Sequence, residues 1–145
     1  MILGLDVSTS ITGATVVDKD GAVVYTTAWD TRNKRHFPTL MAKALWVEGR
    51  LIDIGKKYKI EEVYIEQSLQ SFRSGFSSAK TLSTLSRYNG IISWICFQVF
   101  HREPDYLAAT SARKACGISI PRGMKAKQVV LKFLLDNEPT FKVEY

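Results

Sequence analysis

The sequence predicts an α/β domain built on a mixed, five-stranded sheet with helices on both faces. Short apolar segments separated by turn residues fill the first 29 positions, as expected for consecutive antiparallel strands. Beyond Pro38, segments with helical spacing alternate with short β-branched segments, which is typical of crossover connections. The length of 145 residues suits one domain with one core.

Three antiparallel strands are expected at the start of the chain. Residues 2–7 are apolar and end in a polar cluster, which is typical of a buried strand. Residues 8–13 are small or polar and predict a turn, and residues 14–18 and 22–29 predict the second and third strands. The Asp20-Gly21 pair between those two strands favours a tight hairpin turn.

Helices and strands alternate through the rest of the chain. Pro38 stands where a helix can begin, and apolar residues recur at helical spacing to about Tyr58. A strand is expected at 62–66 and a long helix at 77–100. The last predicted elements are a strand at 105–108, a helix at 110–116 closed by Gly117, and a helix at 124–136 followed by Pro139.

The composition excludes several classes of protein. Hydrophobic residues make up 46% of the chain and charged residues 23%, which is ordinary for a globular protein and unlike a disordered one. Every apolar segment is shorter than the roughly 18 residues that span a bilayer, and the N-terminus lacks the basic residues of a signal peptide. We therefore expect a cytoplasmic protein without a membrane partner. Its net charge of +6 favours a polyanionic partner such as nucleic acid.

Two acidic residues end two of the predicted strands. Asp6 closes the apolar part of the first strand, and Glu66 closes the strand at 62–66. The helix between them is a crossover of the right length for parallel pairing, which would bring the acids side by side. Converging carboxylates repel each other unless a cation lies between them, and Mg²⁺ prefers oxygen ligands. The pair predicts a site where two metal ions act on a phosphodiester. Alternatively, Asp6 accepts backbone amides of its own turn.

The residues around both acids resemble known motifs. Residues 2–13, ILGLDVSTSITG, resemble the first motif of the RuvC-like Holliday-junction resolvases, a strand ending in Gly-Leu-Asp before a small-residue turn. Residues 63–67, VYIEQ, resemble their second motif, whose glutamate is a metal ligand. Residues 71–76, SFRSGF, and the serine-rich helix after them are similar to the phage branch of that family. The likeness extends over essentially the whole chain.

The resemblance implies a single ribonuclease-H-like domain over residues 1–145. Its activity would be metal-dependent cleavage of four-way (Holliday) or branched DNA junctions, in recombination and repair in a bacterial or phage-infected cell. Asp6 and Glu66 would hold Mg²⁺, for which Mn²⁺ substitutes. The long helix would pack against a second copy in a homodimer with two active sites. From the residues alone, packing on the protein's own sheet explains that helix equally well.

Basic residues are expected around the cleaved phosphate. The resembled family places them before the last helix, where Lys114, Lys125 and Lys127 are the candidates here. Their charge would stabilise the transition state, although a solvated start of a helix explains them as well. A second group follows Glu66 and suits phosphate contact and base stacking. This DNA-binding group comprises Phe72, Arg73, Lys80 and Arg87.

The sequence departs from the family in one respect. The resembled enzymes carry a third and usually a fourth ligand on a further helix, for which we find no segment after residues 124–136. We therefore expect a domain without that helix, with weakened metal binding and cutting. Asp136 and Glu138 are the nearest acids, and we interpret Asp136 as a polar helix end.

The sequence also fits functions other than cleavage of DNA junctions. A non-catalytic or truncated domain that only binds nucleic acid fits the missing ligands, and a nuclease acting on RNA would use the same acids. The segment Asp6-Val7-Ser8-Thr9-Ser10 is also close to the phosphate-binding hairpin of actin-like ATPases and sugar kinases. Those proteins need a second lobe and glycine-rich loops, whereas none of the nine glycines here is adjacent to another.

Overall fold

The computed structural model describes residues 1–67 and 78–142 and contains a mixed sheet of five strands. The strands lie in the order β3-β2-β1-β4-β5. Strand β1 is antiparallel to β2 and parallel to β4, β2 is antiparallel to β3, and β4 is parallel to β5. Their bounds are β1 Ile2–Asp6, β2 Ile11–Val17, β3 Val23–Asp30, β4 Glu62–Glu66 and β5 Asp105–Leu107. The predicted fold class is confirmed.

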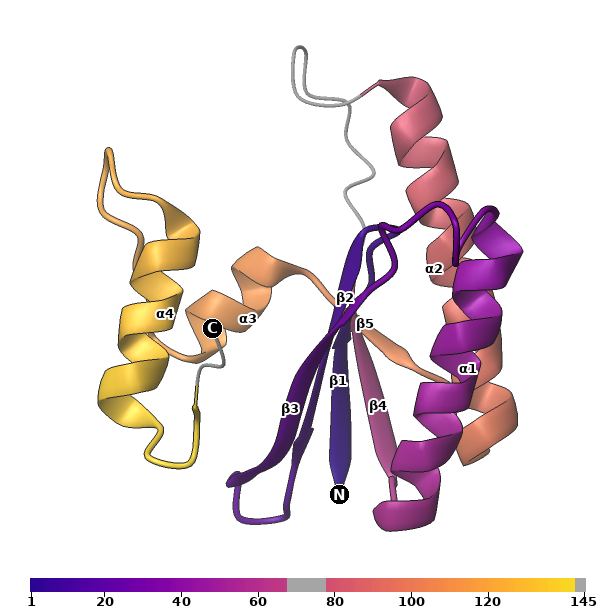
Figure 1. Ribbon diagram of the computed structural model, residues 1–145. Coiled ribbons are helices and arrows are strands. Elements are labelled where there is room, and N and C mark those ends of the chain that lie inside the picture. The colour runs from indigo at the N-terminus through magenta and orange to yellow at the C-terminus, as the bar shows by residue number, and fades with distance from the viewer. Residues whose placement is uncertain (68–77, 143–145) are drawn as a thin grey trace.

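Helices lie on both sides of this sheet. Figure 1 shows α1 (Leu40–Lys57) and α2 (Ala79–Phe100) on one side, and α3 (Ala109–Ala115) and α4 (Ala126–Asn137) on the other. Helices α1 and α2 bury many side chains, whereas α3 and α4 contain no fully buried residue. The segment after α4 is tied to the sheet where the amide of Val23 donates to Thr140 Oγ1 at 2.9 Å. No helix in the described part of the chain is long and apolar enough to cross a membrane.

The core lies between the sheet and the first two helices. Side chains alternate across a strand, and the buried ones are Leu3 and Leu5 of β1 and Val63 and Ile65 of β4. The helices contribute buried apolar residues at helical spacing: Ala44, Val47, Leu51 and Ile54 from α1, and Tyr88, Ile92, Ile95 and Cys96 from α2. This alternation fixes which way the strand-end acids point. Since Leu5 and Ile65 face α1 and α2, Asp6 and Glu66 face the opposite side, where α3 and α4 lie.

The turn between β1 and β2 is shorter than predicted. Strand β2 begins at Ile11, and Gly13, expected in the turn, already pairs with Asp6. The reason is Thr12, a buried residue whose hydroxyl donates to the Ser8 carbonyl at 3.0 Å and accepts from the Ser8 amide at 3.3 Å. These bonds satisfy the backbone amide and carbonyl of Ser8 within the turn. The pairing of β1 with β2 therefore continues up to the turn.

The predicted Asp-Gly hairpin between β2 and β3 is present. Asp18 Oδ1 accepts from the amides of Asp20 and Ala22, at 2.9 and 3.0 Å. Gly21 has a φ of +83°, a conformation that glycine adopts without steric cost. Both long helices are capped as well: Thr39 Oγ1 accepts from an amide of the first turn of α1, and Ser78 Oγ does so in α2. These two capped ends lie toward the edge of the sheet at which β1 ends (Figure 1).

Candidate metal and nucleic-acid site

Asp6 and Glu66 lie next to each other at the carboxyl ends of two parallel strands. The register of β1 and β4 pairs Leu5 with Ile65, so the next residue on each strand is an acid. Glu66 is held from its other side, because it pairs with Leu107 of β5 and the Gln67 amide donates to the Leu107 carbonyl at 2.7 Å. The pairing of three strands therefore brings the two predicted acids together.

Among the described residues, the one that faces Asp6 from β2 is a glycine and has no side chain. Gly13 faces Asp6 across the antiparallel ladder, and a Cβ placed on it would lie 3.8 Å from the Asp6 Cβ. Any longer side chain at this position would extend over the carboxylates. Both acids are exposed, so a ligand can reach them from solvent.

The environment of Glu66 disfavours its charged form. The pKa of Glu66 is raised from 4.5 to about 7, first because the surrounding protein partly desolvates its carboxyl group. Repulsion by the charge of Asp6 and a side-chain hydrogen bond with Asp6 raise the pKa further. Two neighbouring carboxyl groups, in which the charge of Asp6 opposes the ionisation of Glu66, form a donor set that suits a hard divalent cation, which takes oxygen ligands.

Two basic residues approach the acid pair on the face of the sheet that lies opposite the core. The positive charges of Arg113 on α3 and of Lys127 on α4 both lower the pKa of Glu66, Arg113 by more. Arg113 is half-buried, whereas Lys127 is exposed. This agrees with the alternation in the strands, which turns both carboxylates toward α3 and α4 (Figure 1).

The other predicted basic residues lie at varying places around this edge. Lys125 is the N-cap residue of α4, and Lys114 is exposed on α3 beside Arg113. Lys80 lies in the first turn of α2 and Arg87 is exposed further along the same helix. Phe72 and Arg73, like the whole of residues 71–76, lie outside the described residues. Sequence reasoning missed Arg113, although Lys114 next to it was a candidate.

Further metal ligands beside Asp6 and Glu66 were sought among the other acidic residues. Among residues 1–67 and 78–142, no group of three or more His, Cys, Asp or Glu side chains could hold a metal ion. Asp136 is exposed in the last turn of α4, roughly 13 Å along the helix from Lys127 at 1.5 Å per residue. The Ser8 amide, which could have bonded to Asp6, donates to Thr12 instead.

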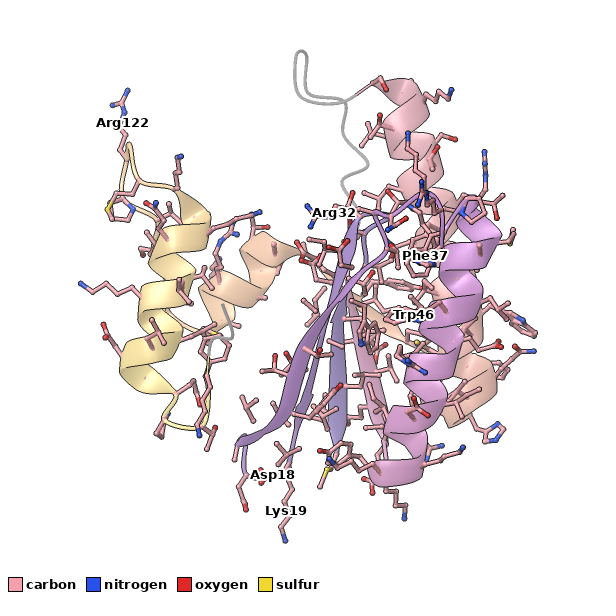
Figure 2. The ribbon with its side chains drawn as sticks, in the orientation of Figure 1. Asp18, Lys19, Arg32, Phe37, Trp46 and Arg122 are labelled. Carbon is pink, nitrogen blue, oxygen red and sulfur yellow. The ribbon has the colours of Figure 1, made fainter. Side chains whose placement is uncertain are left out.

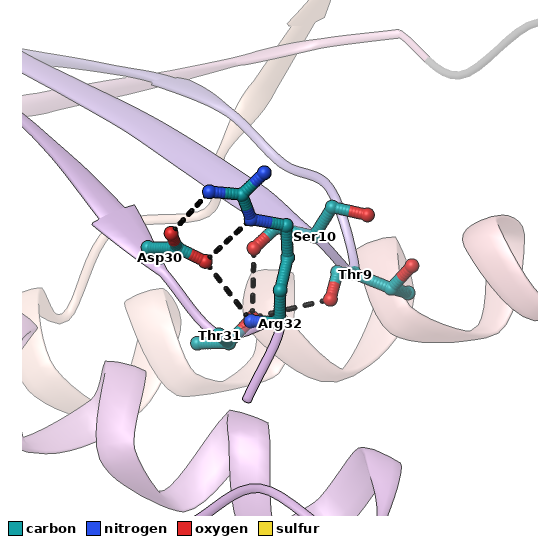
Figure 3. Close-up of polar contacts among 5 residues, drawn as sticks. All are labelled: Thr9, Ser10, Asp30, Thr31 and Arg32. Atoms are coloured by element: carbon teal, nitrogen blue, oxygen red, sulfur yellow. Dashed lines mark hydrogen bonds and ion pairs between the residues drawn. The ribbon is translucent and has the colours of Figure 1, made fainter. Parts of the chain in front are cut away.

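The turn beside Asp6 is braced by the next loop. The Thr31 amide donates to the Ser10 carbonyl at 2.8 Å, and its hydroxyl contacts the carbonyls of Thr9 and Ser10 at 3.1 and 3.2 Å (Figure 3). Lys43 of α1 also donates to the Thr9 carbonyl, at 2.5 Å. Thr31 is buried, so these bonds are sheltered from water and fix the turn that follows Asp6.

The chain matches no family model and no curated protein sequence. It does resemble solved structures. RuvC of T. thermophilus in complex with a Holliday junction substrate is 13% identical, with a TM-score of 0.68 over 92% of this chain and 75% of that chain. A second Thermus thermophilus RuvC structure is 13% identical, with a TM-score of 0.67 over 99% of this chain and 83% of that chain.

A third similar structure comes from a eukaryote. The yeast mitochondrial Holliday junction resolvase Ydc2 is 13% identical, with a TM-score of 0.52 over 93% of this chain and 60% of that chain. These likenesses show that the chain has the ribonuclease-H-like fold of RuvC, as its motifs predicted. At this identity they show the fold alone.

Proposed function

We propose that this chain is a metal-dependent endonuclease that cleaves branched DNA, with the four-way junction as its substrate. The observation that carries the proposal is the adjacency of Asp6 and Glu66 at the ends of β1 and β4, where Asp6 helps to raise the pKa of Glu66 to about 7. Ligands of open α/β sheets bind at the carboxyl ends of strands. The RuvC-like fold and the net charge of +6 favour a nucleic-acid substrate at that edge.

Asp6 and Glu66 would hold Mg²⁺, or Mn²⁺ in its place, through their carboxylate oxygens. The ion would make water a better nucleophile and stabilise charge on the phosphate. Its binding requires Glu66 to lose the proton that Asp6 favours, so the acid pair and the ion are linked through pH. Gly13 leaves the space above Asp6 open for the phosphate.

The basic residues would contact the phosphate groups of the DNA and would not bind the metal ion. Arg113 is close enough to act on the charge of Glu66 and has a planar group that can donate two parallel hydrogen bonds to a phosphate. Lys127 would add a second positive charge near the phosphate during cleavage. Lys114 and Lys125 are exposed nearby and would contact flanking phosphates, as would Lys80 and Arg87 on α2.

A second candidate function is binding without cleavage. It is favoured by one observation: the described residues offer two acidic ligands and no third. A domain with only this pair would hold its ion weakly and depend on the DNA phosphate for further oxygen ligands. RNA is the alternative substrate for either function, because the phosphodiester is the same.

We also propose that the active form is a homodimer joined through α2. Trp94 and Phe97 project from this helix, 59% and 41% exposed, with ring centroids 5.8 Å apart. With Pro104 and the 52% exposed Tyr106 they line a surface hollow of about 450 Å³. Exposed aromatic side chains gathered in one patch are typical of protein interfaces. A twofold dimer would present two acid pairs to two strands of one junction.

The test compares nicking of a synthetic four-way junction and of a matched linear duplex, in Mg²⁺ and in Mn²⁺. We expect nicking of the junction that is lost in Asp6→Asn. The control is Asp20→Asn, the same chemical change in the exposed hairpin turn, which should nick like the wild type. Selective binding of the junction without nicking would favour the non-catalytic function, and equal, weak binding of both DNAs would refute the proposal.

A further inference from the structure

A basic loop joins β3 to α1 at the same edge of the sheet as the acid pair. We use the name β3–α1 loop for residues 31–38. Within the five positions 32–36 it carries Arg32, Lys34, Arg35 and His36, with Asp30 as the acid just before it. The bonds from Thr31 to the turn after Asp6 fasten the start of this loop beside the candidate site.

Strand register directs Asp30, just before the loop, to the substrate side of the sheet, and the loop then runs over the end of the sheet to α1 (Figure 1). Asp6 pairs with Gly13, which in turn pairs with Ala28, so β3 lies two strand spacings, roughly 10 Å, from β1. Trp29 is buried in the core, so Asp30 faces the other side, as Asp6 does. A DNA strand covers such a distance in about three nucleotides at roughly 3.4 Å per step.

Arg32 is held in place by Asp30. Its Nε donates to Asp30 Oδ1 at 2.9 Å and its Nη2 to Oδ2 at 2.6 Å, while its amide also donates to Oδ1 (Figure 3). These bonds lower the pKa of Asp30 to about 2, with the side-chain hydrogen bond as the main cause. A guanidinium has five N–H groups, so those not used by Asp30 can donate to a phosphate from a fixed position.

The rest of the loop is ordered and supplies net charge. Asn33 Oδ1 accepts from the Arg35 amide at 2.9 Å, and the Phe37 amide donates to the Asn33 carbonyl at 2.8 Å. The Phe37 ring packs edge-on against Trp46 of α1, with centroids 5.7 Å apart (Figure 2). The loop is therefore a turn held by hydrogen bonds and by the packing of Phe37, and the exposed side chains of Lys34 and Arg35 extend from it.

No acid within the described residues neutralises these two side chains. The ion pairs among residues 1–67 and 78–142 are Arg32–Asp30 and Arg50–Asp53, and neither includes Lys34 or Arg35. The first turns of α1 and α2, whose N-termini lie toward this edge, also contain no acidic residue. Among the described residues, Asp30 thus balances the charge of Arg32, whereas no acid forms an ion pair with Lys34 or Arg35.

We propose that the β3–α1 loop binds the phosphate backbone of DNA beside the acid pair, with Arg32 as a fixed donor and Lys34 and Arg35 as the charged contacts. The proposal rests on the proposed function, because it takes the DNA to be the strand that reaches Asp6. Figure 2 shows Arg32 beside the end of the sheet and Arg122 at the tip of the loop before α4, toward the same end of the molecule. DNA would then meet basic residues on both sides of the carboxylates.

The test measures junction binding against salt concentration for the full chain and two double variants. The loop variant, Lys34→Gln with Arg35→Gln, removes two exposed charges from the loop. The control, Lys56→Gln with Lys59→Gln, removes two exposed charges at the other end of α1. That end lies roughly 27 Å along the helix axis from its start, at 1.5 Å per residue. Thermal melting of all three proteins checks that each is folded.

We expect the loop variant to bind the junction about ten-fold more weakly at roughly 0.1 M salt. The slope of log K against log salt should become shallower by about 0.9 for each lost phosphate contact, or roughly 1.8 in all. The control should keep the wild-type slope.

The outcomes separate this proposal from the proposed function. If the loop variant and the control have the same affinity and the same slope, the loop does not bind DNA, whatever Asp6→Asn shows for cleavage. If the loop variant loses affinity and slope while Asp6→Asn nicks like the wild type, the loop binds DNA and the proposed active site is wrong. A wild-type chain that binds no DNA would overturn both.

Discussion

At the scale of single residues, the carboxyl group of Glu66 links the fold to the proposed chemistry. Desolvation and the charge of Asp6 raise its pKa to about 7, while Arg113 and Lys127 lower it. The balance places its ionisation near neutral pH, so the group can exchange a proton for a cation under ordinary conditions. An acid at a solvated surface with no charged neighbours would stay ionised and carry no such linkage.

The raised pKa of Glu66 predicts a pH-dependent stability in the absence of divalent ions. Because its folded pKa of about 7 lies above the ordinary 4.5, the folded state binds more protons between these values. The free energy of unfolding should therefore fall as pH rises from 4.5 to 7, with the loss complete above that pH. We expect a contribution on the order of 1 kcal/mol, because solvent screens an exposed carboxylate.

Denaturant unfolding in a chelator, from pH 4.5 to 8, measures this contribution. The Glu66→Gln variant should lose less stability over the window than the wild type. The control is Glu61→Gln, the same change at an exposed position just before β4, which should follow the wild-type curve. Parallel curves for wild type and Glu66→Gln would contradict the raised pKa.

Arg113 is expected to matter more for cleavage than the lysine beside it. Removing its charge in Arg113→Gln should slow junction nicking by roughly 100-fold, the usual effect of deleting one group that stabilises a transition state. It should also move the pH midpoint of nicking upward, because Arg113 lowers the pKa of Glu66. Lys114→Gln is the control and should stay within a few-fold of the wild type. Equal rates and midpoints in the two variants would exclude this role for Arg113.

The acids could be predicted from the sequence, whereas Arg113 could not. Asp6 and Glu66 each close an apolar strand, and the crossover between them fixes parallel pairing. Arg113 reaches the site because of where α3, a short helix after β5, lies against the sheet. The sequence pattern does not predict that position. Leu3 and Leu5 alternate with residues of the opposite face, and this alternation indicates that the next residue, Asp6, points away from the core.

At the scale of elements, sequence patterns predicted the order of strands and helices but not every boundary. The predicted order of nine elements is present, and the Asp-Gly hairpin forms as expected. Strand β2 starts earlier than predicted because Thr12 is buried and its hydroxyl closes the turn by bonding to Ser8. Local composition cannot distinguish these uses of a threonine, since the choice depends on pairing with β1.

Helix α2 gives a prediction about assembly. Burying the exposed Trp94 and Phe97 against a second copy would remove a large apolar area from water. Sedimentation should show a dimer of the wild type and a monomer of Trp94→Arg, in which a charge would have to be buried. The control is Leu45→Arg, which changes a 70% exposed apolar residue on α1 and should leave the dimer intact. A wild-type chain that is monomeric at high concentration would contradict the dimer.

At the scale of the whole molecule, the two sides of the sheet have different tasks. The side covered by α1 and α2 holds the buried core and is tightly packed. The other side carries both carboxylates and faces α3 and α4, which bury no residue fully. The side with the buried core thus fixes the strand ends, while the other side carries the carboxylates together with the basic residues Arg113 of α3 and Lys127 of α4.

Cutting of a four-way junction tests the central claim most directly, namely that Asp6 and Glu66 together drive cleavage. The initial rate of nicking would be followed over a series of Mg²⁺ concentrations for the wild type, Asp6→Asn, Glu66→Gln and the control Asp20→Asn. We predict Mg²⁺-dependent nicking by the wild type and the control, and its loss in both site variants at every concentration. Wild-type nicking that persists in either site variant, or that needs no divalent ion, would contradict the account.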